Sequence, residues 1–460
     1  MVISLTQCGE INYMQGKSDD FKSSIWFNNP DIVFTTTNNN GKVTLTSKHK
    51  NIFEGKLYST IQSNKTNPNG LDEYFGWEND WSPDGQILAV GSPNYETSTT
   101  INTNSGRVYL YRLEELAKPN PSPFNILELK QDERNAFFGT SVRWNPDGTK
   151  LAVGVVGTNS KIGAVFIYNL SDMNNISNPN PSTIISPTTL TPIANFGFYV
   201  NWNFDGSQIV IGAYTDKNNI GSVYIYNTNN LTKPVNIIEP SGRTSFGDTG
   251  FGYKAEWDSA NKYLAIGAMF YDKGSNISLK NDNSGAIYIY SVEQLKTISN
   301  PEPIHTLVAQ TNSEFLGWDV KWSPNGKYLA AGAPGTNKVY IYKTNDFKLT
   351  NPIPTILSVA NTNVFGLSVD WNRTSTRLAV GSDLDNNGIN STGSVYVFDT
   401  NKISLEMKPI QKIVLTGKII VPTSTWVEGL GRGLRWHPSG KFLAVNAFQN
   451  KSSGSVFILQ

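Results

Sequence analysis

The sequence predicts an all-β protein, a seven-bladed β-propeller with four strands in each blade. Three observations predict it. A phrase made of Phe-Gly, a short strand ending in Trp, Leu-Ala-Val-Gly and Gly-x-Val-Tyr-Ile-Tyr returns, with variations, seven times. Each repeat contains several β-branched and aromatic runs separated by turn residues. The first and last parts of the repeat region complement each other, so that together they make up one sheet.

Seven tryptophans mark the repeat, about 59 residues apart on average: Trp81, Trp144, Trp202, Trp257, Trp322, Trp371 and Trp436. This period is longer than that of a standard propeller repeat, so each unit has room for several strands. Because the tryptophans hold equivalent places in every repeat, we expect them to pack between neighbouring blades.

Three strands can be placed in each unit, as the second repeat illustrates. Residues 138–144 form the first strand, and the turn Asn145-Pro146-Asp147-Gly148 reverses the chain because Pro fixes φ and Gly allows φ > 0. Residues 151–154 form the second strand. Residues 163–168 form the third, where β-branched and aromatic side chains alternate as a sheet requires.

A fourth strand follows a Pro-rich connection, since proline belongs at sheet edges and in loops. Six such strands are expected, at residues 126–129, 183–185, 235–238, 305–308, 356–357 and 411–415. The seventh blade lacks one, because the chain stops on its third strand. We therefore predict that Leu57–Gln62 pairs with Gly454–Gln460 and closes the ring, which leaves few exposed edges.

Two families carry similar repeats over roughly residues 56–460. Trp81-Ser82-Pro83-Asp84-Gly85 and the run from Trp322 to Ala330 resemble the WD40-like repeat of TolB-type proteins. Phe138-Gly139-Thr140-Ser141-Val142 and Gly332-Ala333-Pro334 are similar to the FG-GAP repeats of integrin α-chains. The resemblance implies a propeller and indicates little about function. The Asp-x-Asp-x-Asp-Gly calcium loop of FG-GAP repeats is replaced here by Ser-Pro-Asp-Gly or Asn-Pro-Asp-Gly, so we expect no calcium at those turns.

The chain is predicted to have two parts, an N-terminal β arm at residues 1–50 and the propeller at residues 51–460. Strand-like runs occupy residues 24–27, 32–35 and 42–46, and Asn38-Asn39-Asn40-Gly41 is a hairpin signal. Three short strands are marginal alone. The arm is therefore expected to dock either on a partner or on the propeller as an extra sheet.

Composition restricts the partners and leaves the compartment open. No apolar run reaches the roughly 20 residues of a spanning helix, and the N-terminus lacks the pattern of a signal peptide. The formal charge of +1 gives no general attraction to nucleic acid, and the single cysteine, Cys8, has no internal partner. The abundance of Asn, Lys and Ile indicates an AT-rich genome, so a virion or the cytoplasm is the expected location.

The residue before each tryptophan is expected to face the central axis. These residues nearly alternate in charge around a closed ring, and we predict that they form a structural belt of ion pairs between blades. Its members are Asp80, Arg143, Glu256, Lys321, Asp370 and Arg435, with Asn201 completing the ring. The alternative is a charged channel that binds a small ion or ligand, but charges that cancel in pairs are usually structural.

Two weaker candidate sites remain. Trp77 and Trp318 follow Phe-Gly or Leu-Gly in only two repeats, and we expect them near one mouth of the channel, either exposed for a glycan or peptide or partly buried at a blade seam. Asp383, Asp385 and Asn387 alternate like the start of a calcium loop, but the downstream bidentate Glu is missing. An ordinary loop is the favoured interpretation, and no other cofactor is expected.

The sequence favours a non-enzymatic module. The three histidines lie at unrelated places, and nucleophile-elbow and P-loop motifs are missing. We predict a structural or protein-interaction module in a multi-protein assembly, with a virion component as one setting. The alternatives are an adhesin-like propeller that binds a cell-surface glycan or receptor, and a propeller hydrolase or lyase, which would need convergent carboxylates or a metal at the channel mouth.

Overall fold

The computed structural model describes residues 32–39, 42–49, 53–62, 73–96, 104–130, 134–157, 162–187, 194–240, 249–273, 282–385, 393–401, 403–404, 407–414, 429–447 and 454–460. The chain divides into two compact units, Met1–Glu54 and Gly55–Gln460.

The first unit contains an antiparallel hairpin of β1 (Ile32–Asn39) and β2 (Lys42–His49). Asn39 is opposite Lys42 and Ile32 is opposite His49, so the two strands pair as the hairpin signal predicts, while Asn40 and Gly41 lie outside the described residues. The predicted strand at residues 24–27 lies outside the described residues. Whether the arm docks on a partner stays a prediction.

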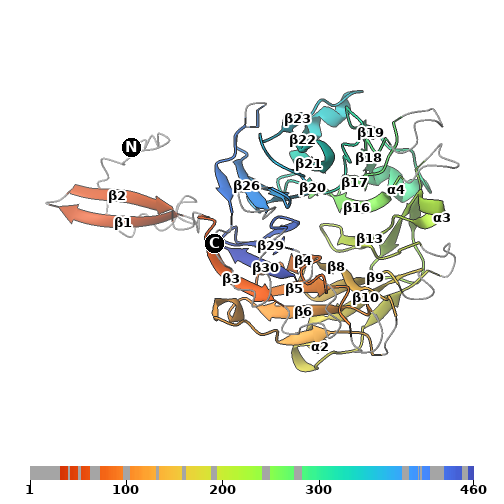
Figure 1. Ribbon diagram of the computed structural model, residues 1–460, viewed down its shortest axis with the longest axis horizontal. Helices are drawn as coiled ribbons and strands as arrows, with labels where there is room; N and C mark the ends of the chain where they lie inside the picture. The colour runs from red at the N-terminus through yellow and green to blue at the C-terminus, as the bar shows by residue number, and fades with distance from the viewer. Residues whose placement is uncertain are drawn as a thin grey trace. The chain divides into compact units, whose positions relative to one another are not determined.

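The second unit is a ring of seven antiparallel four-stranded sheets within the described ranges, as the sequence predicts (Figure 1). Blade 1 consists of β4 (Asn79–Trp81), β5 (Ile87–Ser92), β6 (Arg107–Arg112) and β7 (Asn125–Leu127), and blade 2 of β8 (Phe138–Trp144), β9 (Lys150–Val155), β10 (Ala164–Asn169) and β11 (Thr183–Ile185). Blade 3 consists of β12 (Tyr199–Trp202), β13 (Gln208–Ala213), β14 (Ser222–Asn227) and β15 (Asn236–Ile238), and blade 4 of β16 (Phe251–Trp257), β17 (Tyr263–Ala268), β18 (Ala286–Ser291) and β19 (His305–Val308). Blade 5 consists of β20 (Val320–Trp322), β21 (Tyr328–Ala333), β22 (Lys338–Lys343) and β23 (Thr355–Leu357), and blade 6 of β24 (Ser368–Trp371), β25 (Arg377–Ser382), β26 (Ser394–Asp399) and β27 (Gln411–Ile413).

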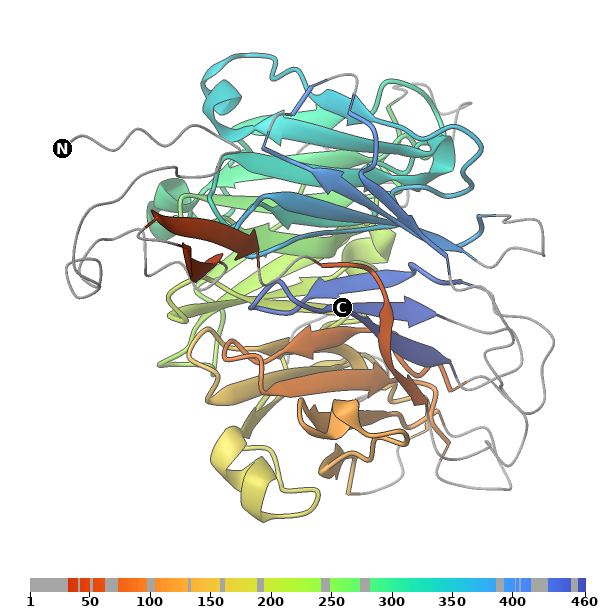
Figure 2. The same ribbon diagram turned by 90° about the vertical axis from the view of Figure 1, so that its left-hand side faces the viewer.

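Blade 7 closes the ring with strands from both ends of the propeller. It consists of β28 (Gly433–Trp436), β29 (Leu443–Ala447), β30 (Ser455–Leu459) and β3 (Leu57–Gln62). Ile61 is opposite Val456 and Gln62 is opposite Ser455, and β3 lies along β30 beside the C-terminus (Figure 2). The predicted pairing of Leu57–Gln62 with Gly454–Gln460 is confirmed.

Short helices fill the connections between strands. The turns η3 (Glu115–Ala117) and η6 (Thr344–Lys348) and the helices α2 (Leu170–Asn175) and α4 (Val292–Thr297) follow third strands, while α3 (Asp216–Asn219) and η5 (Pro334–Thr336) follow second strands. The sequence prediction treated the former as plain Pro-rich connections, because runs of six residues or fewer are too short to show helical periodicity. None of the helices within the described ranges has the length and apolarity needed to cross a membrane.

Glycine pairs and tryptophans hold neighbouring blades together. A Cβ on Gly212 at the end of β13 would lie 2.0 Å from the carbonyl oxygen of Gly252 in blade 4, so only glycine permits this approach. The indole N–H of Trp322 donates to the carbonyl of Glu256 in the preceding blade at 2.9 Å, and that of Trp371 to the carbonyl of Lys321 at 3.1 Å. The repeated Phe-Gly, Val-Gly and Trp positions are therefore the contacts of the blade seam.

Candidate functional site: the mouth of the central channel

Each innermost strand runs from its Phe-Gly or Leu-Gly pair to its Trp, so the ring has a Phe-Gly end, which we call the mouth face, and a Trp end, which we call the turn face. A pocket opens at the mouth face on the ring axis. Every blade contributes to its lining the residue directly after the Phe-Gly or Leu-Gly pair: Trp77, Thr140, Phe198, Tyr253, Trp318, Leu367 and Arg432. Both tryptophans expected near a channel mouth lie in this lining, while their role in binding stays a prediction.

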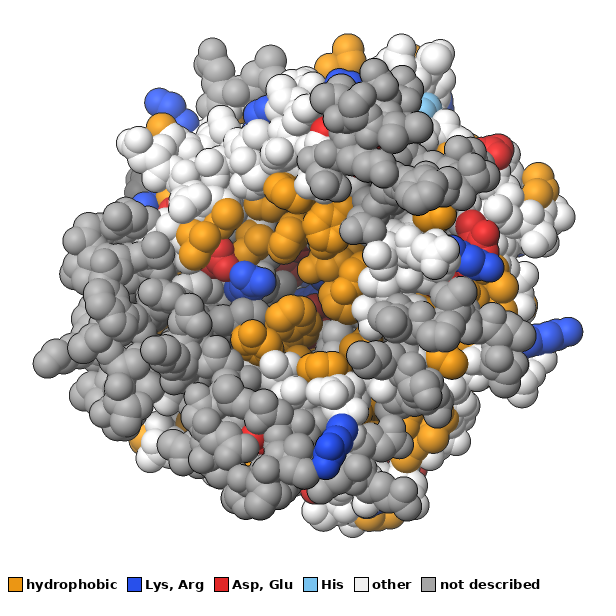
Figure 3. All heavy atoms as spheres, turned by 45° about the vertical axis from the view of Figure 1, so that its right-hand side comes forward, with side chains coloured by type: hydrophobic (Ala, Val, Ile, Leu, Met, Phe, Trp, Pro, Cys, Tyr) orange, Lys and Arg blue, Asp and Glu red, His pale blue; other side chains and the backbone are white. Residues whose placement is uncertain are grey.

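Aromatic side chains border the mouth pocket. The ring of Tyr253 lies 5.8 Å from Trp318 and 4.9 Å from Phe198, so three successive blades present contacting aromatic side chains. All three are half-buried. Figure 3 shows hydrophobic side chains gathered around a hollow that has charged side chains inside it. This partial exposure leaves aromatic surface for a ligand, which fully buried seam residues would not provide.

A second pocket, which we call the aromatic groove, continues from the mouth pocket across blades 1 to 3. It shares Trp77, Thr140 and Phe198 with the mouth pocket. Beyond them, the groove is lined by the apolar side chains Tyr74, Pro93, Phe137, Val156 and Tyr214 and by the amides Asn94, Asn135 and Asn195. The two pockets therefore form one continuous surface with a charged end and an apolar end.

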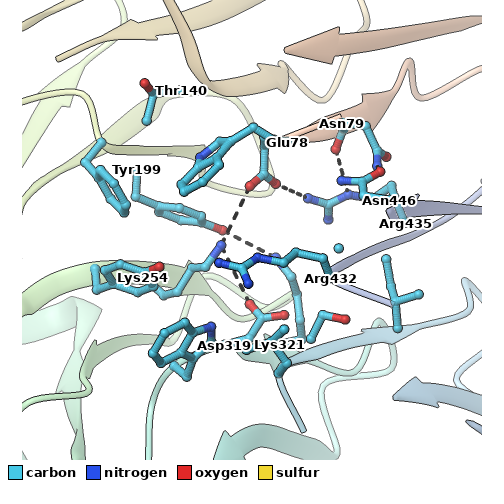
Figure 4. A pocket seen from close by; sticks show the side chains of 18 of the residues that line it. Glu78, Asn79, Thr140, Tyr199, Lys254, Asp319, Lys321, Arg432, Arg435 and Asn446 are labelled. Carbon is cyan, nitrogen blue, oxygen red and sulfur yellow. Dashed lines mark hydrogen bonds and ion pairs between the residues drawn. The ribbon is translucent and has the colours of Figure 1, made fainter. Parts of the chain in front are cut away.

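Glu78 lies in the wall of the mouth pocket, surrounded by cations. Its carboxylate is 2.6 Å from Arg143, 3.5 Å from Arg435 and 3.8 Å from Lys254 (Figure 4). Burial alone would raise the pKa of Glu78, but the positive charges of Arg143, Lys254 and Arg435 hold it well below its usual range. Glu78 is therefore ionised at any physiological pH.

Lys254 projects into the same pocket between two carboxylates. Its Nζ is 3.8 Å from Glu78 Oε2 and 3.8 Å from Asp319 Oδ1, and 4.7 Å from the centre of the Tyr199 ring. Both oxygen distances exceed hydrogen-bond length. The side chain is 16% exposed, and its ammonium lies at ion-pair distance from both carboxylates.

Below this level lie the residues of the predicted ion belt. Lys321 contacts Glu256 in the preceding blade, and Glu256 also accepts hydrogen bonds from Tyr199 and from Asn201 Nδ2 at 2.8 Å. Burial tends to raise the pKa of Glu256, but the charge of Lys321 lowers it overall. The predicted neighbours Glu256 and Lys321 are thus in contact across a blade seam.

At the closing blade, the ion pairs of the belt depart from a strict alternation of positive and negative charge around the ring. Arg435 lies 3.3 Å from Asp80 and 3.9 Å from Asp370, which belong to the two blades that flank it. Burial raises the pKa of Asp370 to about 6 despite Arg435. Arg143 pairs with Glu78 at 2.6 Å, while Asp80 accepts the backbone N–H of Trp144 at 2.9 Å. That the belt sets the blade register stays a prediction.

The sequence reasoning missed Glu78, Lys254, Asp319 and Tyr199, and a simple signal could have found them. Each stands three residues before a marker tryptophan, two residues before a belt position. Side chains two apart on a strand share one face, so the same alternation that selects the belt selects this second layer.

The calcium candidates occupy a loop of blade 6. Asp383 lies 3.1 Å from Arg432, and burial raises the pKa of Asp383. Asp385 accepts hydrogen bonds from Tyr396 at 2.5 Å, Ser382 at 2.6 Å and the Asn363 N–H at 2.8 Å. Asn387 lies outside the described residues. Calcium binding here stays a prediction.

The hydrogen bond from Tyr396 to Asp385 has counterparts in two other blades. Tyr224 donates to Asp216 at 2.7 Å, and Tyr340 donates to Glu314 at 2.6 Å. In all three blades a third-strand tyrosine fixes an acid from a mouth-face loop. No group of three or more acids, histidines or cysteines placed to hold a metal occurs within the described ranges.

The fold defines the class of protein as a seven-bladed β-propeller. Residues 301–343 match the family model described as "WD domain, G-beta repeat". Among solved structures, the β-propeller domain of Cps50 (Swd1) from Myceliophteria thermophila is similar, with 12% sequence identity and a TM-score of 0.54 over 88% of this chain and 98% of that chain. At this identity the likeness shows the fold alone. A comparison with curated proteins gives no match.

Proposed function

We propose that this chain is a non-enzymatic protein-interaction module that binds its partner at the mouth face. One observation carries the proposal: every blade places a side chain at the mouth pocket, and four of the seven are aromatic, namely Trp77, Phe198, Tyr253 and Trp318. Tryptophan and tyrosine dominate the energetics of protein interfaces. A WD repeat match and a propeller fold are typical of protein-interaction modules, and this supports the same interpretation.

The charges of the pocket support binding over catalysis. The two carboxylates that line it, Glu78 and Asp319, would be the candidate acid and base of a hydrolase or lyase. Glu78 is held ionised by Arg143, so it has no proton to donate. Asp319 accepts the backbone N–H groups of Val320 and Val369 at 3.1 and 2.9 Å, which orients both oxygens toward the protein.

The setting that we propose is a multi-protein assembly, with a virus particle as one such setting because of the Asn-, Lys- and Ile-rich composition. A large ring with a mouth face, a turn face and an outer wall suits contacts with several proteins. The second candidate, an adhesin-like propeller that binds a cell-surface glycan or receptor, is favoured by the same aromatic mouth, since sugars also stack on aromatic rings.

Cross-linking mass spectrometry on protein purified from its native source tests the proposal. We expect links to a second protein from lysines on the mouth face, such as Lys217, Lys338 and Lys412. Links confined to Lys262, Lys327 and Lys441 on the turn face would contradict binding at the mouth. Links from Lys17, Lys22 or Lys42 would indicate that the N-terminal arm contacts the partner as well.

Substitution at the mouth gives the second part of the test. Phe198 is half-buried in both pockets, whereas Phe204 is 66% exposed in a turn-face loop. We expect Phe198→Ala to abolish recovery of the partner found by cross-linking, and the matched variant Phe204→Ala to leave it unchanged. Equal recovery with both variants would refute the mouth as the binding site.

A further inference from the structure

A groove runs along the outermost strand of blade 4. It lies between β19 and the connection of blade 5 that leads to β23, and we call it the β19 groove. Its lining includes all four residues of β19, from His305 to Val308, and Thr350, Asn351, Pro352 and Pro354 of the connection. Successive side chains of a strand point to opposite faces, so a lining that contains all of them indicates that the groove follows the edge of the strand.

The edge of β19 presents main-chain groups without partners. The N–H of Ala309 donates to the carbonyl of Gly285 at 3.2 Å, one step beyond the last pair of the β18–β19 ladder. Hydrogen-bonded and non-hydrogen-bonded pairs alternate along an antiparallel ladder, so Thr306 and Val308 direct their N–H and carbonyl groups away from β18. These groups have no hydrogen-bond partner within the described part of the chain.

At two other seams, the next blade covers the corresponding edge. Asn236 at the start of β15 donates to the carbonyls of Leu295 and Ile298 in blade 4, at 3.0 Å each. Asn300 in the same connection accepts the backbone N–H of Glu239, beyond the end of β15, at 2.8 Å. Blades 1 and 2 form the same contacts through a corresponding set of residues: Asn125, Met173, Ile176, Asn178 and Glu128.

The seam between blades 4 and 5 departs from this arrangement. His305 stands where blades 1 and 3 have the asparagine of the strand, and its Nε2 lies 2.8 Å from the carbonyl of Phe347. Asn351 begins an Asn-Pro-x-Pro run like its counterparts in blades 2 and 4, but no hydrogen bond joins it to β19 in the described ranges. The histidine thus holds the connection near the start of β19 and leaves the edge beyond it open.

The chemistry of the groove specifies an extended, uncharged polypeptide as its occupant. Outward N–H and carbonyl groups on a strand edge are complementary to the main chain of another strand, and β19 has no charged residue or proline to prevent such pairing. Among the described residues that line the groove, none is Asp, Glu, Lys or Arg, so a charged side chain would lose hydration there without gaining an ion pair.

The rim of the groove favours apolar side chains in that polypeptide. Ile353 is the x residue of the Asn-Pro-x-Pro run in blade 5 and is 80% exposed, whereas blades 2 and 4 have Asn180 and Glu302 at this position. It lies between two prolines of the groove lining, Pro352 and Pro354. Apolar side chains of a bound segment would remove this surface from water.

We propose that an extended segment of a partner protein binds in the β19 groove as an additional strand of blade 4. Its main chain pairs with Thr306 and Val308, and its apolar side chains contact Pro352 and Ile353. β19 is the outermost strand of its blade, so this surface belongs to the outer wall of the ring (Figure 1). The groove shares no lining residue with the mouth pocket or the aromatic groove, and it gives the chain a second interaction surface beyond the proposed function.

A display library of random dodecapeptides, selected on the immobilised full-length chain, tests strand addition. Thr306→Pro removes the outward N–H and leaves the ladder with β18 in place, because edge strands tolerate proline on their free side. Thr306→Val keeps the N–H and is the matched control. We expect selected peptides whose binding, measured by fluorescence anisotropy, weakens about tenfold or more with Thr306→Pro and stays unchanged with Thr306→Val.

Two measurements on the wild-type chain keep the test valid where Thr306→Pro fails to fold. Binding of a selected peptide should slow amide hydrogen exchange in residues 303–310. A scan that places one N-methyl group at a time along the peptide should weaken binding at every second position, because alternate N–H groups of an added strand face β19.

The outcomes separate strand addition from binding at the mouth. No enrichment, unchanged exchange in residues 303–310, or N-methyl effects without a period of two would overturn the proposal. Selected peptides that all depend on Phe198 and not on Thr306 would also overturn it, while supporting the mouth as a binding site. A dimer of the wild-type chain that Thr306→Pro converts into a monomer would show that a second copy occupies the groove, which contradicts a partner segment.

Discussion

Lys321→Met tests whether the charges at the channel axis stabilise the ring. The substitution keeps the length and apolar stem of the side chain and removes the charge that pairs with Glu256. Both side chains are only 9% exposed. Removing one partner of a buried ion pair costs about 3–5 kcal/mol, because the other charge stays buried without compensation. Glu256 keeps hydrogen bonds from Tyr199 and Asn201, so we expect the lower end, about 3 kcal/mol.

The size of the change can be measured by calorimetry. A propeller of roughly 400 residues unfolds with an entropy of about 0.8 kcal/mol/K, so a loss of about 3 kcal/mol lowers the Tm by about 3–4 °C. The double variant Lys321→Met with Glu256→Gln should recover most of this loss, since no buried charge is left unpaired. A single variant with an unchanged Tm, or a double variant as unstable as the single one, would refute a stabilising belt.

Three further predictions concern the seam, the closing blade and pH. Gly212→Ala should lower the Tm strongly or prevent folding, because its Cβ would lie 2.0 Å from the Gly252 carbonyl oxygen. The control Gly440→Ala, whose Cβ would have no atom within 4 Å, should cost only about 1 kcal/mol of φ strain. Equal Tm losses would refute the close-approach argument. Deleting residues 1–52 should leave the propeller monomeric. Deleting residues 1–62 removes β3 and exposes the edge of β30, so it should cause aggregation visible by size-exclusion chromatography. Two equally monomeric proteins would contradict closure of the ring by β3. Burial lowers the pKa of His437, so the unfolded chain binds its proton more readily than the folded one, and stability present above the ordinary pKa of 6.5 should be lost as pH falls below it. His437→Asn should flatten this part of the Tm–pH curve, and a curve parallel to that of the wild type would show that His437 contributes nothing to it.

The ring itself could be predicted from the sequence because its determinants repeat. Six of the seven seams have a glycine near the end of a second strand opposite the glycine of a Phe-Gly or Leu-Gly pair, and the repetition of these positions makes the pattern visible over local variation. The fourth strands were placed to within two residues for the same reason, since Pro-rich connections precede them. The helices of the connections do not repeat in sequence, and six residues are too few for a periodic signal.

The closing seam shows where repetition stops helping. Asn446 stands where six other blades have the glycine of Val-Gly, Ile-Gly or Ala-Gly, and its side chain accepts a hydrogen bond from Asn79. A Cβ on Gly433 would lie 2.5 Å from Asn446 Nδ2, so glycine replaces the larger residues of other blades here to make room. The larger Asn446 and the smaller Gly433 compensate each other in size although they lie apart in the sequence, and only the structure shows that they are in contact.

The mouth pocket was only half predictable for a related reason. The alternation of a strand fixes which side chains face the axis, so the second layer of charges could have been inferred from the belt. Which charges pair depends on the reach of each side chain, and Arg143 reaches Glu78 because Glu78 stands two residues nearer the mouth than Asp80. Because Arg143 pairs with Glu78 Oε1, Lys254 lies 3.8 Å from Glu78 Oε2 and 3.8 Å from Asp319 Oδ1, between the two carboxylates. The pairing of charges in the mouth pocket thus arises from the competition among neighbouring side chains, which a linear pattern of charges does not encode.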